Sequence, residues 1–312
     1  MIALASNDGD RTPLIDLFFK HYYPRKLRAT SKKNTRLFGI ALNQFARFLN
    51  HTPLVCHLDD DILQDFCYWV VERGCSPYTA NCYRSKLIAL WNHLARLRLV
   101  EKFPTIPKLK EPHRIPRAWT PDQLAKLFRA CEEQTGRICN VPASLWWHAL
   151  HALIWDTGER ITATLSLSWD DLAWDTRVIV SKAENRKGGK ADQAFKLHPD
   201  TVQALTKLRE FSTGDLLFPV DFSVSTIYNR YRRLLEKAGL PTDRNHKFHC
   251  LRRSVASYFE AAGGDATKLL GHSARRVTEK SYLDPTITQT LHASDVLFRP
   301  RISLPCEPSS GS

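Results

Sequence analysis

The chain has 312 residues, which is enough for two domains of ordinary size and too few for a larger multidomain assembly. Its 45 Lys and Arg outnumber its 32 Asp and Glu, and the net charge of +13 indicates a polyanionic partner, either nucleic acid or an anionic membrane. A hydrophobic content of 43% excludes a largely disordered chain, and no apolar run reaches the roughly 18–20 residues that a transmembrane helix needs. The eight cysteines are scattered without a CxxC pair, and Asp8 and Asp10 stand where an export signal would be apolar. These features predict a cytoplasmic protein with reduced thiols.

The front of the chain is predicted to be a basic helical domain over residues 1–114. Residues 1–117 hold 19 Lys and Arg against 10 Asp and Glu, whereas residues 118–312 hold 26 against 22. Apolar residues recur at helical spacing and predict helices over residues 32–50, 58–74 and 76–100. Ser31 and Ser76 stand at the caps of the first and last of these helices, and Gly74 ends the middle one.

A proline-rich, basic linker is predicted at about residues 101–117, because residues 101–118 contain four prolines and five Lys or Arg. Thr120 and Pro121 then start a new helix, which puts the domain boundary near residue 115 and gives a second domain of residues 115–312. This domain is expected to contain further helices over residues 142–158, 223–240 and 248–264, and a disordered tail at about residues 304–312.

Two strand-like segments separate these helices. Residues 175–184 and 193–199 flank the basic stretch NRKGGKAD, in which Gly188-Gly189 predicts a two-residue hairpin turn. The predicted fold class is therefore mainly α with a small antiparallel β-sheet (α+β).

Four short patterns in the second domain contain residue types that could carry chemistry. In chain order they are TGER at 157–160, RKGGK at 186–190, HCLR at 249–252, and LGH at 270–272 followed by Tyr282. Each one alone has an ordinary structural explanation, such as a solvated helix face or a hairpin tip in water. In this order and spacing they resemble the tyrosine recombinase (phage integrase) family, whose signature is an Arg after a TGxR turn, a Lys on a β-hairpin, HxxR, LGH and a Tyr shortly after.

The resemblance covers nearly the whole chain and implies both a fold and a function. It implies a helical SAM-like core-binding domain followed by a tyrosine recombinase catalytic domain, in the two-domain arrangement of Xer recombinases. The implied enzyme is a site-specific DNA recombinase or integrase that cuts and rejoins strands through a covalent 3′-phosphotyrosine, with no metal and no ATP. The absence of a P-loop and of clustered carboxylates fits this expectation.

The resemblance assigns four residues to the phosphate itself. Arg160 and Arg252 would stabilise the negative charge that builds up on the non-bridging oxygens, for which two forked guanidiniums are suited. His272 would donate a further hydrogen bond to these oxygens, and Tyr282 would be the nucleophile.

Two more residues would move protons. By resemblance the hairpin lysine protonates the departing 5′ oxygen; Lys187 aligns best, with Lys190 as the alternative. His249 would act as a base or as an orienting group toward Tyr282 and the phosphate.

The sequence departs from the family pattern at three positions. Ala163 stands where an acidic residue is usual, three positions after the TGxR arginine, and Asp156 and Glu159 are the nearby carboxylates that could compensate. The gap from His272 to the tyrosine is ten residues where nine is commoner, and Arg253 replaces a commoner histidine.

Double-stranded DNA recombination sites are the expected partner, held mainly by the basic front domain and the linker. Candidate phosphate contacts are Lys32, Lys33, Arg36, Arg84, Lys108, Lys110, Arg114 and Lys190, each of which could equally be a solvated surface charge. The helix around residues 81–86 is a candidate for a major groove. The family works as a tetrameric synaptic complex, so self-association is expected, with accessory DNA-bending or directionality proteins as further partners and no membrane.

Two other functions stay open at this point. The chain could be a DNA-binding protein that descends from a recombinase and has lost activity, for instance through Ala163, or a type IB topoisomerase-like enzyme that relaxes DNA. The expected location in each case is the cytoplasm, in association with the nucleoid.

Overall fold

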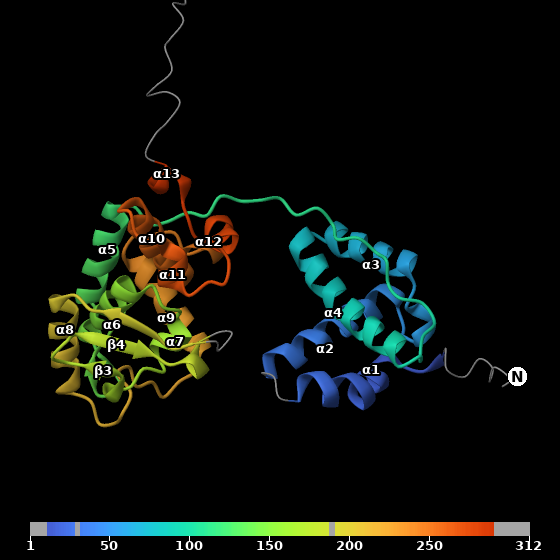
Figure 1. Ribbon diagram of the computed structural model, residues 1–312, viewed down its shortest axis with the longest axis horizontal. Helices are drawn as coiled ribbons and strands as arrows, with labels where there is room; N and C mark the ends of the chain where they lie inside the picture. Colours follow the sequence, from blue (N-terminus) through green and yellow to red (C-terminus); the bar gives the residue numbers. More distant parts are fainter. Residues whose placement is uncertain (1–10, 29–31, 187–190, 290–312) are drawn as a thin grey trace, which may run out of the picture. The chain divides into compact units, whose positions relative to one another are not determined.

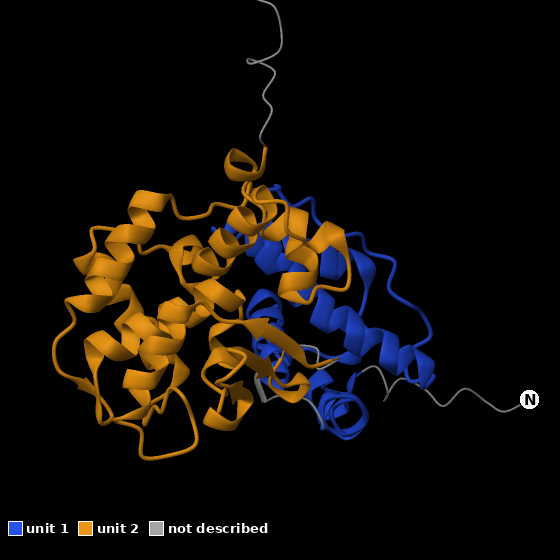
Figure 2. Ribbon diagram, turned by 60° about the vertical axis from the view of Figure 1, so that its left-hand side comes forward, with its two compact units in different colours: residues 1–113 blue, residues 114–312 orange. Residues whose placement is uncertain are grey.

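The computed structural model describes residues 11–28, 32–186 and 191–289, and only the backbone of Lys32 and Lys33. The chain divides into two compact units, residues 1–113 (unit 1) and residues 114–312 (unit 2), coloured separately in Figure 2. The predicted cap Ser31, the hairpin residues Lys187 and Lys190, and the predicted disordered tail lie outside the described residues.

Unit 1 is a helical bundle around one apolar core (Figure 1). Its elements are α1 (Leu14–Leu17), a π-helical segment (Phe18–Leu27), α2 (Lys32–Leu49), a 3₁₀ turn (Val55–His57), α3 (Asp60–Glu72) and α4 (Pro77–Arg96). The three predicted helices of this region are confirmed. Their ends follow local signals: the side chain of Asp59 accepts hydrogen bonds at the start of α3, and that of Ser76 does so at the start of α4. The helical segments before residue 28 were not predicted, and the second of them contains Pro24.

The first half of the predicted linker is attached to unit 1 by hydrogen bonds. The carboxylate of Asp60 accepts from the backbone N–H of Thr105 at 2.9 Å, and the indole of Trp91 donates to the carbonyl of Lys102 at 2.7 Å. The amide of Asn81 pairs with Leu109 in both directions, at 2.9 and 3.0 Å. The face of α4 that carries Asn81 is therefore covered by the linker and is not open to a DNA groove.

Unit 2 contains most of the helices and all of the strands in the described residues. Its helices are α5 (Pro121–Glu132), α6 (Ala143–Thr157), α7 (Ile161–Thr164), α8 (Pro199–Arg209), α9 (Val224–Lys237), α10 (Phe248–Ala261), α11 (Ala266–Leu270), α12 (Arg275–Ser281) and α13 (Pro285–Thr288). Its strands are β1 (Arg137–Ile138), β2 (Val141–Pro142), β3 (Leu172–Ala173), β4 (Val178–Ser181) and β5 (Gln193–Lys196). The mainly helical α+β class is confirmed.

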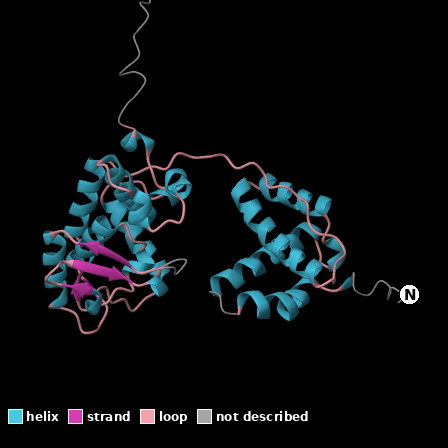
Figure 3. Ribbon diagram, viewed as in Figure 1, coloured by secondary structure: helices cyan, strands magenta, loops and turns pink. Residues whose placement is uncertain are grey.

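Helix α6 is the centre of the unit 2 core. It is rich in apolar residues and buries, among others, Trp146, Leu150 and Leu153, while α5, α8 and α10 pack around it. Figure 3 shows the strands β3, β4 and β5 at one side of the unit, in an antiparallel sheet of that order. None of the helices in the described residues has both the length and the apolar character needed to cross a lipid bilayer.

The two strand-like segments are confirmed as β4 and β5, and the predicted Gly188-Gly189 turn lies outside the described residues. Strands β4 and β5 pair antiparallel, and their ladder ends at Ser181 and Gln193. Side chains replace the ladder at this point: the carboxylate of Asp192 accepts from the backbone N–H of Ala183 at 2.8 Å, and a 3₁₀ turn follows. Helix α13 follows Tyr282 closely and ends at Thr288, with Gln289 in an extended conformation.

Candidate active site

The first motif forms a tight turn at the end of α6. Gly158 ends the helix in the left-handed conformation (φ +62°), and a Cβ on it would lie 3.1 Å from Leu270 and 3.3 Å from Val255. A glycine is needed here because α10 and α11 approach the backbone closely. The turn thus brings the residues that follow it next to the HCLR and LGH motifs.

Arg252 is fixed at this junction. It lies in the second turn of α10 with a side chain that is 1% exposed, and it donates to the carbonyls of Gly158 and Leu270, the latter at 3.0 Å. Its Nε is buried and has no hydrogen-bond partner in the described residues. Arg160 begins α7 and is half-buried, and its guanidinium forms no hydrogen bond with another described residue. Both guanidiniums therefore keep donors for a ligand.

His272 follows Gly271, which ends α11 in a left-handed turn. Its Nδ1 lies 2.9 Å from the hydroxyl of Thr278, and that hydroxyl accepts from Thr267 at 3.1 Å. While it accepts from Thr267, the Thr278 hydroxyl keeps its own hydrogen and can donate it to Nδ1 of His272. The neutral ring then carries its proton on Nε2, a buried nitrogen that has no partner in the described residues.

Tyr282 lies directly beside these groups. The centre of its ring is 5.4 Å from the guanidinium of Arg252 and 4.6 Å from the ring of His272. Its backbone is attached at two points, since its N–H donates to the carbonyl of Thr278 at 2.8 Å and its carbonyl accepts from Ser257 at 3.2 Å. The gap of ten residues after His272 is occupied by α12, and Tyr282 follows the last residue of that helix.

His249 also lies near the tyrosine. It is in the first turn of α10, is exposed, and its ring centre is 6.3 Å from that of Tyr282. Five of the six predicted catalytic residues are thus gathered around one point, and the sixth, Lys187, lies outside the described residues.

The site is strongly positive. Burial first, and then the neighbouring Arg160, lower the pKa of Arg252 to about 10, so its guanidinium stays charged at neutral pH. Burial first, and then the guanidiniums of Arg252, Arg160 and Arg186 in that order, together lower the pKa of His272 to about 4. His272 is therefore neutral at pH 7 and can donate from Nε2 to an anion without being charged itself.

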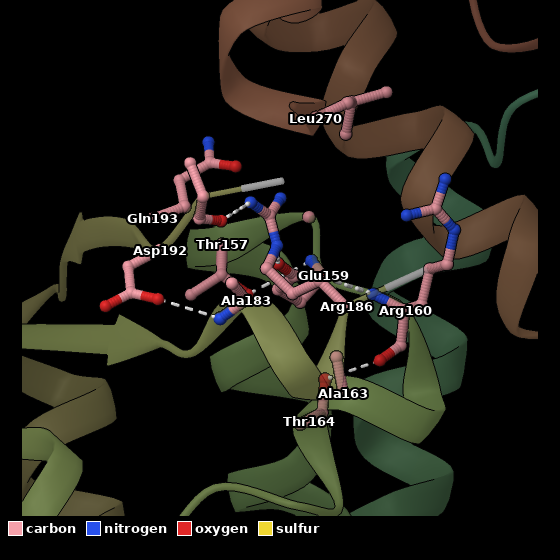
Figure 4. A network of polar contacts seen from close by, with 12 residues as sticks. Thr157, Glu159, Arg160, Ala163, Thr164, Ala183, Arg186, Asp192, Gln193 and Leu270 are labelled. Atoms are coloured by element: carbon pink, nitrogen blue, oxygen red, sulfur yellow. Dashed lines mark hydrogen bonds and ion pairs between the residues drawn. The ribbon is translucent and has the colours of Figure 1, made fainter. Parts of the chain in front are cut away.

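The carboxylate near the site is that of Glu159. Ala163 is buried in α7, and Asp156 points elsewhere, because it accepts from the backbone of His198 at 2.7 Å. Glu159 is 2% exposed and contacts Arg186 and Arg252 (Figure 4 shows it with Arg186). The sequence analysis named Glu159 only as a nearby acid. It gave no role to Arg186, although this residue begins the RKGGK pattern and directly precedes the hairpin lysine.

The candidate phosphate contacts differ in their surroundings. Those with exposed side chains are Arg36, Lys108, Lys110 and Arg114. Arg84 is half-buried and donates to the carbonyl of Ile106, so it also holds the linker to α4. Among the described residues, no group of three or more His, Cys, Asp or Glu side chains is arranged to hold a metal ion.

A family model and related sequences both identify the family to which the chain is similar. A model of the phage integrase family matches residues 117–288. The tyrosine recombinase XerD of Haemophilus influenzae is 23% identical over 287 residues, which cover 85% of this chain and 91% of the relative. An integrase of Enterobacteria phage P21 is 26% identical over 151 residues, which cover 47% of this chain and 36% of the relative.

Solved structures share the fold. A lambda integrase dimer bound to a COC′ core site has a TM-score of 0.67 at 18% identity and covers 85% of this chain and 94% of its own. A lambda integrase tetramer bound to a Holliday junction has a TM-score of 0.68 at 19% identity and covers 86% of this chain and 80% of its own. Because the family model spans more than half of the chain, the chain belongs to the phage integrase family, the tyrosine recombinases, and is an enzyme of the site-specific DNA recombinase class.

Proposed function

We propose that the chain cuts and rejoins DNA strands through a covalent bond between Tyr282 and a backbone phosphate. The observation that carries the proposal is the position of Tyr282 against Arg252 and His272. Each of these two residues holds a buried nitrogen without a partner in the described residues, Nε of Arg252 and Nε2 of His272. Two buried donors beside a tyrosine hydroxyl are suited to receive an oxyanion, and a phosphodiester supplies one.

In the proposed cleavage step, the Oη of Tyr282 bonds to phosphorus while the bond from phosphorus to the 5′ oxygen breaks. The tyrosine proton passes to His249, and the departing oxygen takes a proton from Lys187 and leaves as a 5′-hydroxyl. The phosphate remains on Tyr282 as a 3′-phosphotyrosyl ester, which keeps the free energy of the broken bond. Attack by a 5′-hydroxyl reverses each transfer, so rejoining needs neither ATP nor a metal.

The positive groups act on the non-bridging oxygens. Arg160, Arg252 and His272 surround the place where negative charge increases as the fifth bond to phosphorus forms. Donors of this kind are worth about 10²- to 10³-fold in rate each when they are aimed at the developing charge. Unlike His272, the two arginines are charged before the substrate arrives and also attract it.

We propose that double-stranded recombination sites bind to the basic front domain (residues 1–114) and the catalytic domain (residues 115–312). The phosphate contacts would come from α2, from α4, from the linker and from the β4–β5 connection, through Lys32, Lys33, Arg36, Arg84, Lys108, Lys110, Arg114 and Lys190. Four copies would assemble on two sites, in line with the tetrameric state of the lambda integrase on a Holliday junction. Accessory DNA-bending or directionality proteins would assist, and the enzyme would act in the cytoplasm on DNA of the nucleoid.

The test begins with the DNA that the protein binds. Chromatin capture and sequencing identify a site, and a nicked suicide duplex of that site releases a short fragment on cleavage and so traps the intermediate. We expect a covalent protein–DNA adduct with the wild-type chain and none with Tyr282→Phe, which keeps the ring and its packing.

Adduct formation and a plasmid relaxation assay separate the two alternatives. A wild-type protein that binds the site tightly without forming an adduct is a DNA-binding protein and not a recombinase. Relaxation of any supercoiled plasmid, without preference for the site, identifies a topoisomerase-like enzyme instead.

A further inference from the structure

The carboxylate of Glu159 is buried and both of its oxygens are engaged. Oε1 accepts from Nε of Arg186 at 2.5 Å, and Oε2 accepts from the backbone N–H of Arg160 at 3.0 Å. Oε2 also lies 3.8 Å from Nη1 of Arg252. In Figure 4 the guanidiniums of Arg186 and Arg160 extend to opposite sides of Glu159. One acid thus contacts two arginine side chains and fixes the backbone of a third.

Arg186 comes from a different part of the chain, the connection between β4 and β5. Its Nη1 approaches the carbonyl of Ala191 at 3.5 Å, and its side chain is 11% exposed. A Cβ added to Gly271 would lie 2.6 Å from Nη2 of Arg186, so this guanidinium fills the space beside the LGH turn. Arg186 therefore packs against the LGH turn while it binds the acid of the TGER turn.

The carboxylate of Glu159 offsets repulsion between the positive charges of the site. Arg252, Arg160 and Arg186 each lie close enough to His272 to lower its pKa, and Arg160 also lowers the pKa of Arg252. Three guanidiniums repel one another, and in the described residues Glu159 is the one carboxylate that pairs with Arg252 or Arg186. Arg252 is almost fully buried, and a buried charge without a counter-charge is strongly unfavourable. Without Glu159 the guanidiniums would move apart.

We propose that Glu159, paired with Arg186, is a positioning residue that holds Arg252 in place for the phosphate. The inference rests on the proposed function, because it assigns Arg252 to the scissile phosphate. Ala163 supplies no carboxylate, so the acid of this site comes from the TGER turn itself.

The first test compares two substrates. One suicide duplex carries the normal scissile phosphodiester, and the other carries a methylphosphonate, in which a methyl group replaces one non-bridging oxygen and removes its negative charge. We expect Glu159→Gln to slow adduct formation on the phosphodiester by about 10- to 100-fold, as a misplaced group does, with DNA affinity little changed. On the neutral methylphosphonate the loss should be much smaller, because less charge needs to be stabilised.

Matched variants show whether the pair works as a unit. Glu236→Gln makes the same chemical change in an exposed acid on α9, which pairs with Arg232 at 3.7 Å, and should leave the rate unchanged. Arg186→Gln should slow the phosphodiester reaction, and Glu159→Gln with Arg186→Gln should be no slower than Glu159→Gln alone. Equal losses on both substrates, or additive losses in the double variant, would overturn the proposal.

A second test needs no DNA and stands apart from the proposed function. The ring protons of His272 are titrated by NMR in the wild-type chain and in Glu159→Gln. If the guanidiniums move away, the pKa of His272 rises from its value of about 4; if they stay, the loss of a nearby negative charge leaves it unchanged or lowers it. A rise supports the positioning role of Glu159 even if the wild-type chain forms no adduct. In that case the proposed function is wrong and the positioning of Arg252 by Glu159 still holds. An unchanged or lower value overturns the inference. If Glu159→Gln does not fold, Glu159→Asp, which keeps the charge and shortens the side chain, is titrated in its place and read in the same way.

Discussion

Replacing Thr278 by valine keeps the shape of a fully buried side chain and removes one hydroxyl. That hydroxyl links Thr267 to Nδ1 of His272 through contacts of 3.1 and 2.9 Å. Two hydrogen bonds of about 0.5–1.5 kcal/mol each are lost, so we expect the free energy of unfolding to fall by about 1–3 kcal/mol.

The larger effect should be on catalysis. Without Thr278, nothing fixes the proton of His272 on Nε2, and the ring can take the form in which Nε2 accepts and cannot donate to the phosphate. We expect adduct formation to slow by about 10- to 100-fold, the range known for loss of the partner that orients a metal-binding histidine.

The assay is single-turnover cleavage of the suicide duplex, with ¹⁵N NMR to report which nitrogen of His272 carries the proton. Thr278→Ser keeps the hydroxyl and should retain most of the rate, which separates the hydrogen bond from general packing. A Thr278→Val protein that cleaves at the wild-type rate, with the proton still on Nε2, would refute this explanation of the tautomer.

Three further predictions concern DNA binding, the LGH turn and pH. Lys110→Ala and Arg114→Ala should each weaken DNA binding and lower the salt slope of the affinity by about 1, measured by fluorescence anisotropy; an unchanged slope would exclude a phosphate contact. Gly271→Ala should cost about 1–2 kcal/mol in denaturant unfolding from its left-handed backbone alone, and should slow cleavage because Arg186 must move. Burial lowers the pKa of His151 from 6.5 to about 4. The contribution of the neutral, buried ring to the free energy of unfolding is therefore complete above pH 6.5 and falls by about 3 kcal/mol as the pH drops to 4. Denaturant unfolding at pH 7 and pH 4 checks this: the fall in the free energy of unfolding should be about 3 kcal/mol smaller in His151→Phe than in the wild-type chain.

Much of this fold could be predicted because its helices begin and end at local signals. Ser76 and Thr120 cap helices whose first residue is proline, and the structure places both caps where the sequence pattern does. The family motifs are local as well, since each is only three to five residues long, and their order along the chain carried the resemblance.

The parts that could not be predicted depend on contacts between distant segments. Nothing near Arg186 in the sequence reveals that its side chain binds Glu159, 27 residues earlier. The same holds for Asn81. The sequence analysis placed it in a helix that could enter a DNA groove, whereas its side chain pairs with Leu109 in the linker. The end of the β4–β5 pairing also depends on such a contact, because the carboxylate of Asp192 accepts from the backbone N–H of Ala183, nine residues earlier.

The central claim is that Tyr282 becomes bonded to the 3′ phosphate of the cut strand, and mass spectrometry of the trapped adduct tests it most directly. After digestion with protease and nuclease, we predict a peptide that contains Tyr282 and carries a nucleotide through its 3′ phosphate, while the released strand ends in a free 5′-hydroxyl. A nucleotide on another residue, or a protein attached to the 5′ end of the cut strand, would contradict the proposed mechanism.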